Sequence, residues 1–358
     1  AIITPRYTES TSGVILAAVG DLNQARSTNH SLYRSTNGCD WTVSDELGGQ
    51  LVADVKLSPR DPSIGIVVTE NEDDLNRIFI TDDSGETWAS TDVVVEDRVF
   101  RNIRFARGES TAIWVTATQQ ETMQAWAYRS LDNGLSWTEH EVPIPEGSDP
   151  FTTLDVLEVD ANDPDTAWFV MGPYLSDHLV KTSDGGSTFT EVYAIDRDII
   201  DGAQDGDGGL WLVLSGNTTV YAVDDEDGFI EVDAAPMGLG VETDPDTVML
   251  ATRVSTAGGP LAISSDGRSF EVVDVFSSLQ TMPSCEVGSD HDVFCSPLWE
   301  DLADRLSSTP ESSSRDTGDT GQVRDDSMRS SGCCRSEAKQ SSVGLLAMII
   351  LALGRRRI

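Results

Sequence analysis

The chain is poor in positive charge. Among its 358 residues, 24 are Lys or Arg and 61 are Asp or Glu, so the formal net charge is −37. A surface of this kind repels nucleic-acid phosphates and anionic lipid headgroups, and the composition therefore argues against nucleic-acid partners. The acidic surface allows weak, non-specific calcium binding, but no cofactor is predicted.

Histidine is scarce, and the common catalytic motifs are absent. No Gly-x-Ser-x-Gly elbow and no phosphate-binding Gly-Lys-Ser/Thr loop occurs. Segment 201–209 is rich in Asp and Gly, but an EF-hand alignment from Asp201 puts Ala203 at position 3 and Leu212 at position 12, which cannot bind calcium in that way. We predict a turn there. The histidines have no metal-ligand spacing, which argues against zinc: His30, His140, His178 and His291.

Cysteine is also sparse, with five residues. Cys285 and Cys295 are close in sequence and are predicted to form a disulfide in an exported protein. Cys39 has no evident partner. Because the chain begins at Ala1 without an initiator Met or a leader peptide, we expect missing upstream sequence that could supply a leader, a further blade and a partner for Cys39.

No hydrophobic run is long enough for an ordinary membrane span. The longest, 343–354, has 12 residues, whereas a bilayer core requires about 17–20. It follows a Ser-, Thr-, Asp- and Gly-rich stretch, 307–332, that is predicted to be a disordered linker. The run ends in three arginines, which favour a cytoplasmic tip. A short helix is predicted at 297–306, before the linker.

What the sequence does contain is a repeat. A short apolar strand is followed by Ser or Thr, then Asp or Asn two residues later, one or two Gly and an aromatic residue. A degenerate sixth copy occupies 223–229. The five clear copies are Ser35, Asn37 and Trp41; Thr81, Asp83 and Trp88; Ser130, Asp132 and Trp137; Thr182, Asp184 and Phe189; and Ser264, Asp266 and Phe270.

A second turn signal keeps register with the first. Asp-Pro pairs begin at Asp61, Asp163 and Asp244, each between two apolar runs and upstream of the next repeat motif. Asp and Asn side chains accept hydrogen bonds from nearby backbone N–H groups, while Gly and Pro set the turn dihedrals. Each repeat unit is therefore predicted to contain four short strands, which is typical of a propeller blade. We predict an all-β propeller of six or seven blades over 1–306, including the Cys285–Cys295 loop and the short helix.

The repeats resemble those of the Asp-box, or BNR, family over about residues 13–275. The resemblance implies that the repeat motifs, which we call boxes, lie at the blade periphery, stabilise the blade and are not catalytic. The family includes sialidases, sortilin-like receptors and photosystem assembly factors, so the resemblance is informative about fold more than function.

The last segment, 333–358, resembles the C-terminal sorting signals of myxobacterial surface proteins. That resemblance implies cleavage near Cys333 or Cys334 and attachment of the exported protein to the cell surface or outer membrane. Before cleavage, the apolar segment would lie in the membrane with its arginines on the cytoplasmic side.

Sialidase activity is the most specific enzymatic hypothesis. It requires three arginines that grip a carboxylate, an Asp acid/base and a Tyr nucleophile paired with Glu. The nearest match to the family's first arginine motif is Phe100-Arg101-Asn102-Ile103, which lacks the expected Pro and follows two boxes. On a regular strand Arg101 and Arg107 would share one face and Arg104 would point to the other. Arg101 and Arg104 are catalytic candidates under this hypothesis alone.

The preferred hypothesis is non-catalytic. A surface-displayed propeller would bind an extracellular glycan or protein ligand across its central face, where the variable loops Thr69–Asn76 and Gln119–Gln124 suit recognition. Two alternatives are a sialidase-like glycoside hydrolase and an assembly factor for a membrane partner.

Overall fold

A computed structural model describes most of the chain up to residue 273. The described residues are 6–9, 13–19, 31–71, 75–144, 152–172, 177–215, 220–224, 228–232, 238–244, 247–252, 261–267 and 269–273. The predicted Cys285–Cys295 pair, the helix at 297–306, the linker and the C-terminal sorting segment with Cys333 and Cys334 lie outside them.

The described residues form six antiparallel sheets of four strands each. Sheet 1 contains β1 (Arg6–Glu9), β2 (Ile15–Val19), β3 (Ser31–Ser35) and β4 (Thr42–Val43); sheet 2 contains β5 (Val52–Leu57), β6 (Gly65–Thr69), β7 (Asn76–Thr81) and β8 (Ala89–Val95); sheet 3 contains β9 (Arg98–Phe105), β10 (Ile113–Gln119), β11 (Ala125–Ser130) and β12 (Thr138–Val142). Sheet 4 contains β13 (Thr153–Val159), β14 (Ala167–Gly172), β15 (Asp177–Thr182) and β16 (Thr190–Ile195); sheet 5 contains β17 (Ile199–Gln204), β18 (Leu210–Leu214), β19 (Val220–Asp224) and β20 (Gly228–Glu231); sheet 6 contains β21 (Gly238–Asp244), β22 (Thr247–Thr252), β23 (Leu261–Ser264) and β24 (Glu271–Val273).

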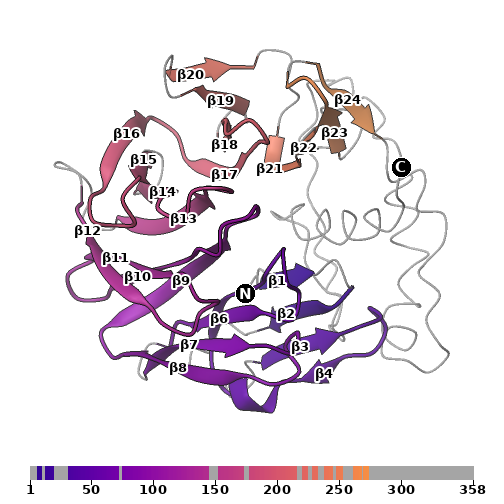
Figure 1. Cartoon of the computed structure of the whole chain (residues 1–358), viewed down its shortest axis with the longest axis vertical. Coiled ribbons are helices and arrows are strands. Elements are labelled where there is room, and N and C mark those ends of the chain that lie inside the picture. Colours follow the sequence, from indigo (N-terminus) through magenta and orange to yellow (C-terminus); the bar gives the residue numbers. More distant parts are fainter. Residues whose placement is uncertain are drawn as a thin grey trace, which may run out of the picture.

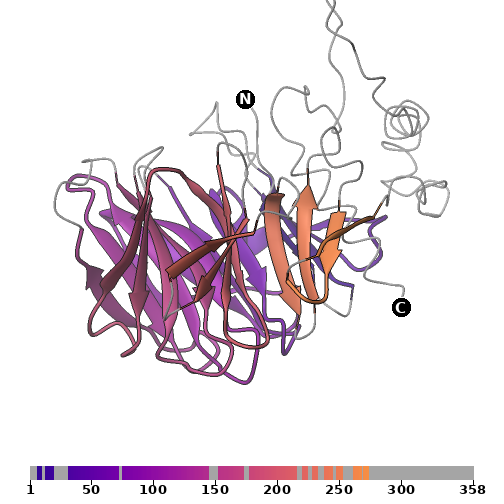
Figure 2. The ribbon, with the colours of Figure 1, turned by 90° about the horizontal axis from the view of Figure 1, so that it is seen from above.

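The sheets are arranged around a common axis as the blades of a propeller (Figure 1). The first strand of each sheet is innermost, and consecutive inner strands contact one another from β1 through β5, β9, β13 and β17 to β21. Seen from the side, the strands cross the thickness of a disc (Figure 2). The all-β propeller predicted from the repeats is confirmed, with six blades among the described residues.

The repeat motif forms the turn between the third and fourth strands of a blade, as predicted. In sheet 3 the Ser130 hydroxyl donates to Asp132 Oδ1 (2.9 Å) and accepts from the Gly134 N–H (2.9 Å). Asp132 also accepts from the Ser136 N–H (2.8 Å) and hydroxyl (2.6 Å). Thr81 with Asp83 and Thr182 with Asp184 repeat this pattern, and Ser35 with Asn37 and Ser264 with Asp266 form shorter versions.

Replacing Asp132 with Ala is expected to lower the free energy of unfolding by about 1–2 kcal/mol, because three hydrogen bonds of an exposed turn are lost. Burial opposes ionisation, but hydrogen bonds from Ser136 and Ser130 together hold the Asp132 pKa below its usual range. Denaturant unfolding measures the change. Asp82→Ala, at an exposed position of the neighbouring box, is the matched control and should stay within about 0.5 kcal/mol. Equal losses in the two variants would contradict a structural role for the box Asp.

Box glycines pack directly against the preceding blade. Gly85 and Gly134 have φ values of +79° and +88°, which L-residues rarely adopt. A Cβ at Gly85 would lie 2.8 Å from Leu16 Cδ2 in sheet 1, and one at Gly134 would lie 2.6 Å from Ile66 Cδ1 in sheet 2. The boxes therefore hold adjacent blades together, and these two positions have no room for a side chain.

Aromatic side chains fill the spaces between blades. Trp114 of sheet 3 packs edge-on against Phe169 of sheet 4, with ring centroids 5.4 Å apart, and Phe169 contacts the box residue Phe189 at 5.6 Å. Trp88 belongs to the core shared by sheets 1 and 2, and Phe270 contacts Trp211 of sheet 5. Such contacts account for the aromatic residues that close these repeats.

The Asp-Pro pairs at Asp61 and Asp163 form turns between first and second strands, as the sequence predicted, whereas the third pair lies partly outside the described residues. In sheet 2 the Asp61 carbonyl accepts from the Ile64 N–H (2.9 Å), while its carboxylate accepts from the Ser63 N–H (3.0 Å). The prediction for 201–209 was partly wrong, because residues 201–204 complete β17 and the turn comprises only 205–209. Asp205 closes that turn through the Gly209 N–H (2.8 Å).

Candidate functional site

Two faces of the disc are distinguished by their turns. We call the side that carries the first-to-second-strand turns and the turns of the repeat motif the box face, which includes residues 58–64 and 131–137. We call the opposite side the loop face, which includes residues 70, 71, 75 and 120–124. Because the strands are antiparallel, connections alternate between these faces within every blade.

Near the axis, inner strands are joined by side chains. Asn102 of β9 accepts from the Val156 N–H of β13 (2.9 Å) and donates to the Val156 carbonyl (2.8 Å). Asp54 of β5 accepts from the Ile103 N–H (3.0 Å), and Asp201 of β17 accepts from the Val241 N–H (3.1 Å). The inner strand is an edge strand, so these side chains satisfy backbone groups that would otherwise lack partners. We refer to them as the axial clasps.

The three arginines singled out in the sequence all reach toward neighbouring blades at the axis. Arg101 forms a two-point pair with Asp155 of β13, at 3.1 and 3.3 Å. Arg104 donates to the Leu157 carbonyl (3.0 Å) and lies 3.7 Å from Asp201.

Arg107 reaches furthest. It lies in the turn after β9 on the box face, pairs with Glu242 of sheet 6, and lies 3.4 Å from Glu158 of sheet 4. Burial opposes its charge, but Glu158 and Glu242 raise its pKa above the usual value. One side chain from sheet 3 therefore links sheets 4 and 6 across the box-face end of the axis.

The prediction that Arg101 and Arg104 point to opposite faces of their strand was wrong. A β-bulge in β9 shifts the register between Val115 and Ala117 of the partner strand, so Arg101 and Arg104 both reach β13. Arg107 lies after the last residue of β9, so the alternation of side chains along the strand does not determine its direction. Inner strands β5, β13, β17 and β21 carry similar register shifts, so the bulge is a repeated feature of the axis.

Glu158 is the most deeply buried charge of this cluster, with 1% of its surface exposed. Burial raises its pKa to about 7, against the opposing attraction of Arg107 and Arg104. Within the described part of the chain its Oε2 atom makes no hydrogen bond, although Arg107 is nearby. The cluster thus contains a carboxyl group whose charge changes near neutral pH.

The chemical capacity of the cluster follows from these pairs. A sialidase-type grip requires guanidinium groups free to hold a substrate carboxylate. Each of the three arginines is instead held by a carboxylate or a carbonyl of another blade. In the described residues, no group of three or more His, Cys, Asp or Glu side chains is arranged to hold a metal ion.

The structure brings Arg101 and Arg104 together at the axis, but their partners were missed from the sequence. The missed acidic residues are Asp155, Glu158, Asp201 and Glu242. The sequence did contain one signal for contacts at the axis. A polar residue recurs in the first strand of several blades, in register with the repeat, as Asp54, Asn102 and Asp201.

The predicted recognition loops are partly structural. Thr69 and Asn76, at the ends of the first, are 0% and 1% exposed. Asn76 donates to the Arg98 carbonyl of the next blade (2.9 Å), which fixes the end of that loop. In the second loop Gln119 donates to Asp97 (2.8 Å) on the same face. The ends of both loops are therefore fixed by hydrogen bonds.

Cys39 is disulfide-bonded. The remaining cysteines of the chain, at positions 285, 295, 333 and 334, are all outside the described residues, and so is the partner of Cys39. Among the same described residues, no helix has the length and apolar character required to cross a membrane.

Comparison with known proteins identifies the fold but not the activity. No known family model matches the sequence, and no curated protein matches it either. Among solved structures, the chain is similar to virginiamycin B lyase from Staphylococcus aureus (13% identity, 78% of this chain and 85% of the lyase, TM-score 0.50) and to a prolyl endopeptidase (12% identity, 75% and 40%, TM-score 0.53). It also matches the GH74 xyloglucanase from Xanthomonas campestris (16% identity, 73% of this chain, TM-score 0.48) and spans only 44% of that protein. At these identities the likeness shows the β-propeller fold alone.

Proposed function

We propose that this chain is a propeller displayed at the cell surface, where it binds glycan or protein ligands without catalysis. The observation that carries the proposal is the state of the axial arginines. Arg101, Arg104 and Arg107 are each engaged by another blade, so the polar centre of the propeller serves to hold the blades together. Charged residues used in this way are poorly placed to act on a substrate.

The position of Arg107 favours ligand binding on the loop face. Its pairs with Glu158 and Glu242 bridge the axis on the box face. Among the described residues, a ligand that approaches the axis from the loop face does not meet this bridge, and Arg101 and Asp155 keep 34% and 41% of their side chains exposed. Display outside the cell is supported by the Cys39 disulfide and by the resemblance of the C-terminal segment to surface-sorting signals.

Catalysis of the sialidase type is the second candidate, favoured by the convergence of three arginines at one axis. The full chain should release no product from a fluorogenic sialoside above the enzyme-free rate, and Arg101→Ala should behave identically. Turnover that collapses in Arg101→Ala, with an unchanged melting temperature, would replace the proposal with an enzyme.

Binding itself requires a separate screen. The full chain is immobilised and exposed to a panel of glycans and extracellular proteins, with a substitution at the exposed loop-face residue Glu121 as a probe of the binding face. We expect at least one ligand whose affinity changes in Glu121→Ala, because Glu121 lies in the second recognition loop. Ligands insensitive to every loop-face substitution would contradict the assigned face.

A further inference from the structure

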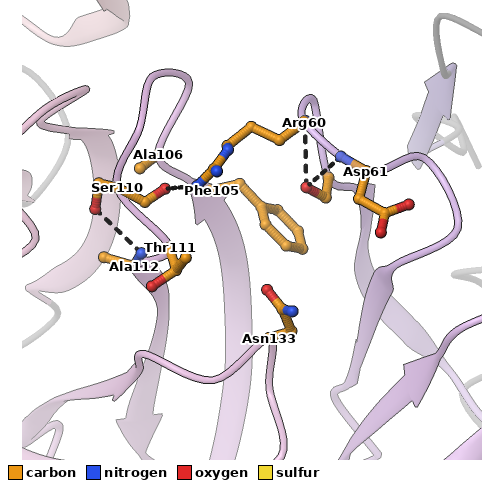
Figure 3. A pocket seen from close by; sticks show the side chains of 9 residues that line it. Arg60, Asp61, Phe105, Ala106, Ser110, Thr111, Ala112 and Asn133 are labelled. Atoms are coloured by element: carbon orange, nitrogen blue, oxygen red, sulfur yellow. Dashed lines mark hydrogen bonds between the residues drawn. The ribbon is translucent and has the colours of Figure 1, made fainter.

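A pocket opens on the box face between sheets 2 and 3 (Figure 3). Its wall combines turns of both blades with the third Asp-box. The Phe105 ring lies in the middle of the pocket, Arg60 extends over one side, and Asn133 faces the ring from the other (Figure 3). The lining residues are Ser58, Arg60, Asp61, Phe105, Ala106, Ser110, Thr111, Ala112 and Asn133.

Phe105 distinguishes this inter-blade space from the equivalent positions in sheets 2 and 4. It is the last residue of β9, at the position that Leu57 occupies in β5 and Val159 in β13. Leu57 and Val159 are buried, with 6% and 0% exposed, whereas Phe105 is half-buried. The pocket therefore offers part of an aromatic ring where sheets 2 and 4 have a covered aliphatic side chain.

Asn133 is the second distinguishing residue. It has a φ of 60°, and the matching box positions hold Ser84 (φ 61°) and Gly185 (φ 70°). Its side chain is exposed, and in the described part of the chain its amide makes no hydrogen bond. A free amide supplies both a donor and an acceptor at the edge of the ring.

The rest of the rim is polar and balanced in charge. Arg60 donates to the carbonyls of Glu109 (2.7 Å) and Ser110 (3.2 Å), which ties the two blades together across the pocket. Its positive charge is offset by the carboxylates of Asp61 and Glu109, the latter 3.9 Å away. An anionic ligand would have to approach an acidic protein without an unpaired cation here.

We infer that this pocket binds an uncharged saccharide unit. A sugar ring presents an apolar face of C–H groups that packs on an aromatic ring, and its hydroxyls act as both donors and acceptors. Phe105 supplies the ring, and Asn133 with the Ser and Thr hydroxyls supplies matched polar groups. An apolar peptide anchor fits less well, because only Phe105 and two alanines of the lining are apolar. The inference rests on the proposed binding function but assigns a site on the opposite face.

The test measures binding of soluble oligosaccharides of glucose, galactose, mannose and xylose to the full chain by calorimetry. The decisive variants restore the residues of other blades: Phe105→Leu, as at Leu57, and Asn133→Ser, as at Ser84. At least one neutral oligosaccharide should bind, and each variant should weaken it about tenfold or more. Leu135→Ser, which places the residue of Ser187 on the same turn outside the pocket, should bind normally.

Folding is controlled by requiring unchanged melting temperatures, and Asn133→Ser keeps the test informative if Phe105→Leu perturbs the core. Binding by no member of the panel would overturn the site, as would binding that survives both variants. If Glu121→Ala weakens a ligand and the pocket variants do not, the loop-face function stands and the pocket assignment fails. A ligand that instead depends on the exposed Leu131 and Leu135 would identify a peptide surface and also overturn the inference.

Discussion

Replacing Glu158 with Gln is expected to raise the free energy of unfolding by on the order of 3 kcal/mol above pH 7, and to leave it nearly unchanged below pH 4.5. Burial raises the pKa of this carboxyl from 4.5 to about 7 in the folded protein. A raised folded-state pKa means that the neutral form favours folding. Its contribution is fully present below pH 4.5 and is lost as pH rises to about 7.

The Gln variant holds a neutral side chain at every pH, so the stability difference between the two proteins should grow across that window. Denaturant unfolding at several pH values measures it. Glu121→Gln, an exposed carboxylate, is the control and should change stability by no more than about 0.5 kcal/mol. Parallel pH profiles for the wild type and Glu158→Gln would show that the buried carboxyl does not titrate in this range.

Replacing Asn102 with Leu is expected to lower the free energy of unfolding by about 2–4 kcal/mol. The substitution removes the two bonds of the axial clasp to Val156 and the bond from the Thr116 hydroxyl (2.7 Å). The backbone N–H and carbonyl of Val156 then lose their partners at the inner edge of β13. Leu is close to Asn in size, so the loss reports hydrogen bonding more than packing.

Two comparisons sharpen this test. Asn102→Asp keeps an acceptor for the Val156 N–H but places a second oxygen against the Val156 carbonyl, so it should also destabilise. Asn162→Leu, at an exposed turn of sheet 4, should remain within about 0.5 kcal/mol of the wild type. A wild-type midpoint for Asn102→Leu in a urea titration would mean that water or other groups replace the clasp.

The repeat made the fold predictable from sequence. A box such as Thr81-Asp82-Asp83-Ser84-Gly85 forms its hydrogen bonds within a few residues, so its turn depends little on the rest of the chain. The same holds for the Asp-Pro turns. Strand positions followed from these two signals, including Leu154–Val159, which lies within β13.

The axis could not be predicted in the same way. Contacts such as Arg107 to Glu242 join residues of different blades, and their partners depend on how the blades are rotated around the axis. The bulge in β9 changes which face Arg104 occupies, and no turn residue announces it in the sequence. The pocket around Phe105 has the same origin, since Arg60 and Asn133 approach it from separate turns.

Every described sheet is built from four consecutive strands, and none combines strands from distant parts of the chain. A gene duplication or deletion that begins and ends between blades would therefore add or remove a complete sheet without leaving an incomplete one. The new neighbours would need only compatible box and inner-strand surfaces. Blade number in such a lineage can change by recombination in single steps, while the inner clasps and box contacts restrict which blades can become adjacent.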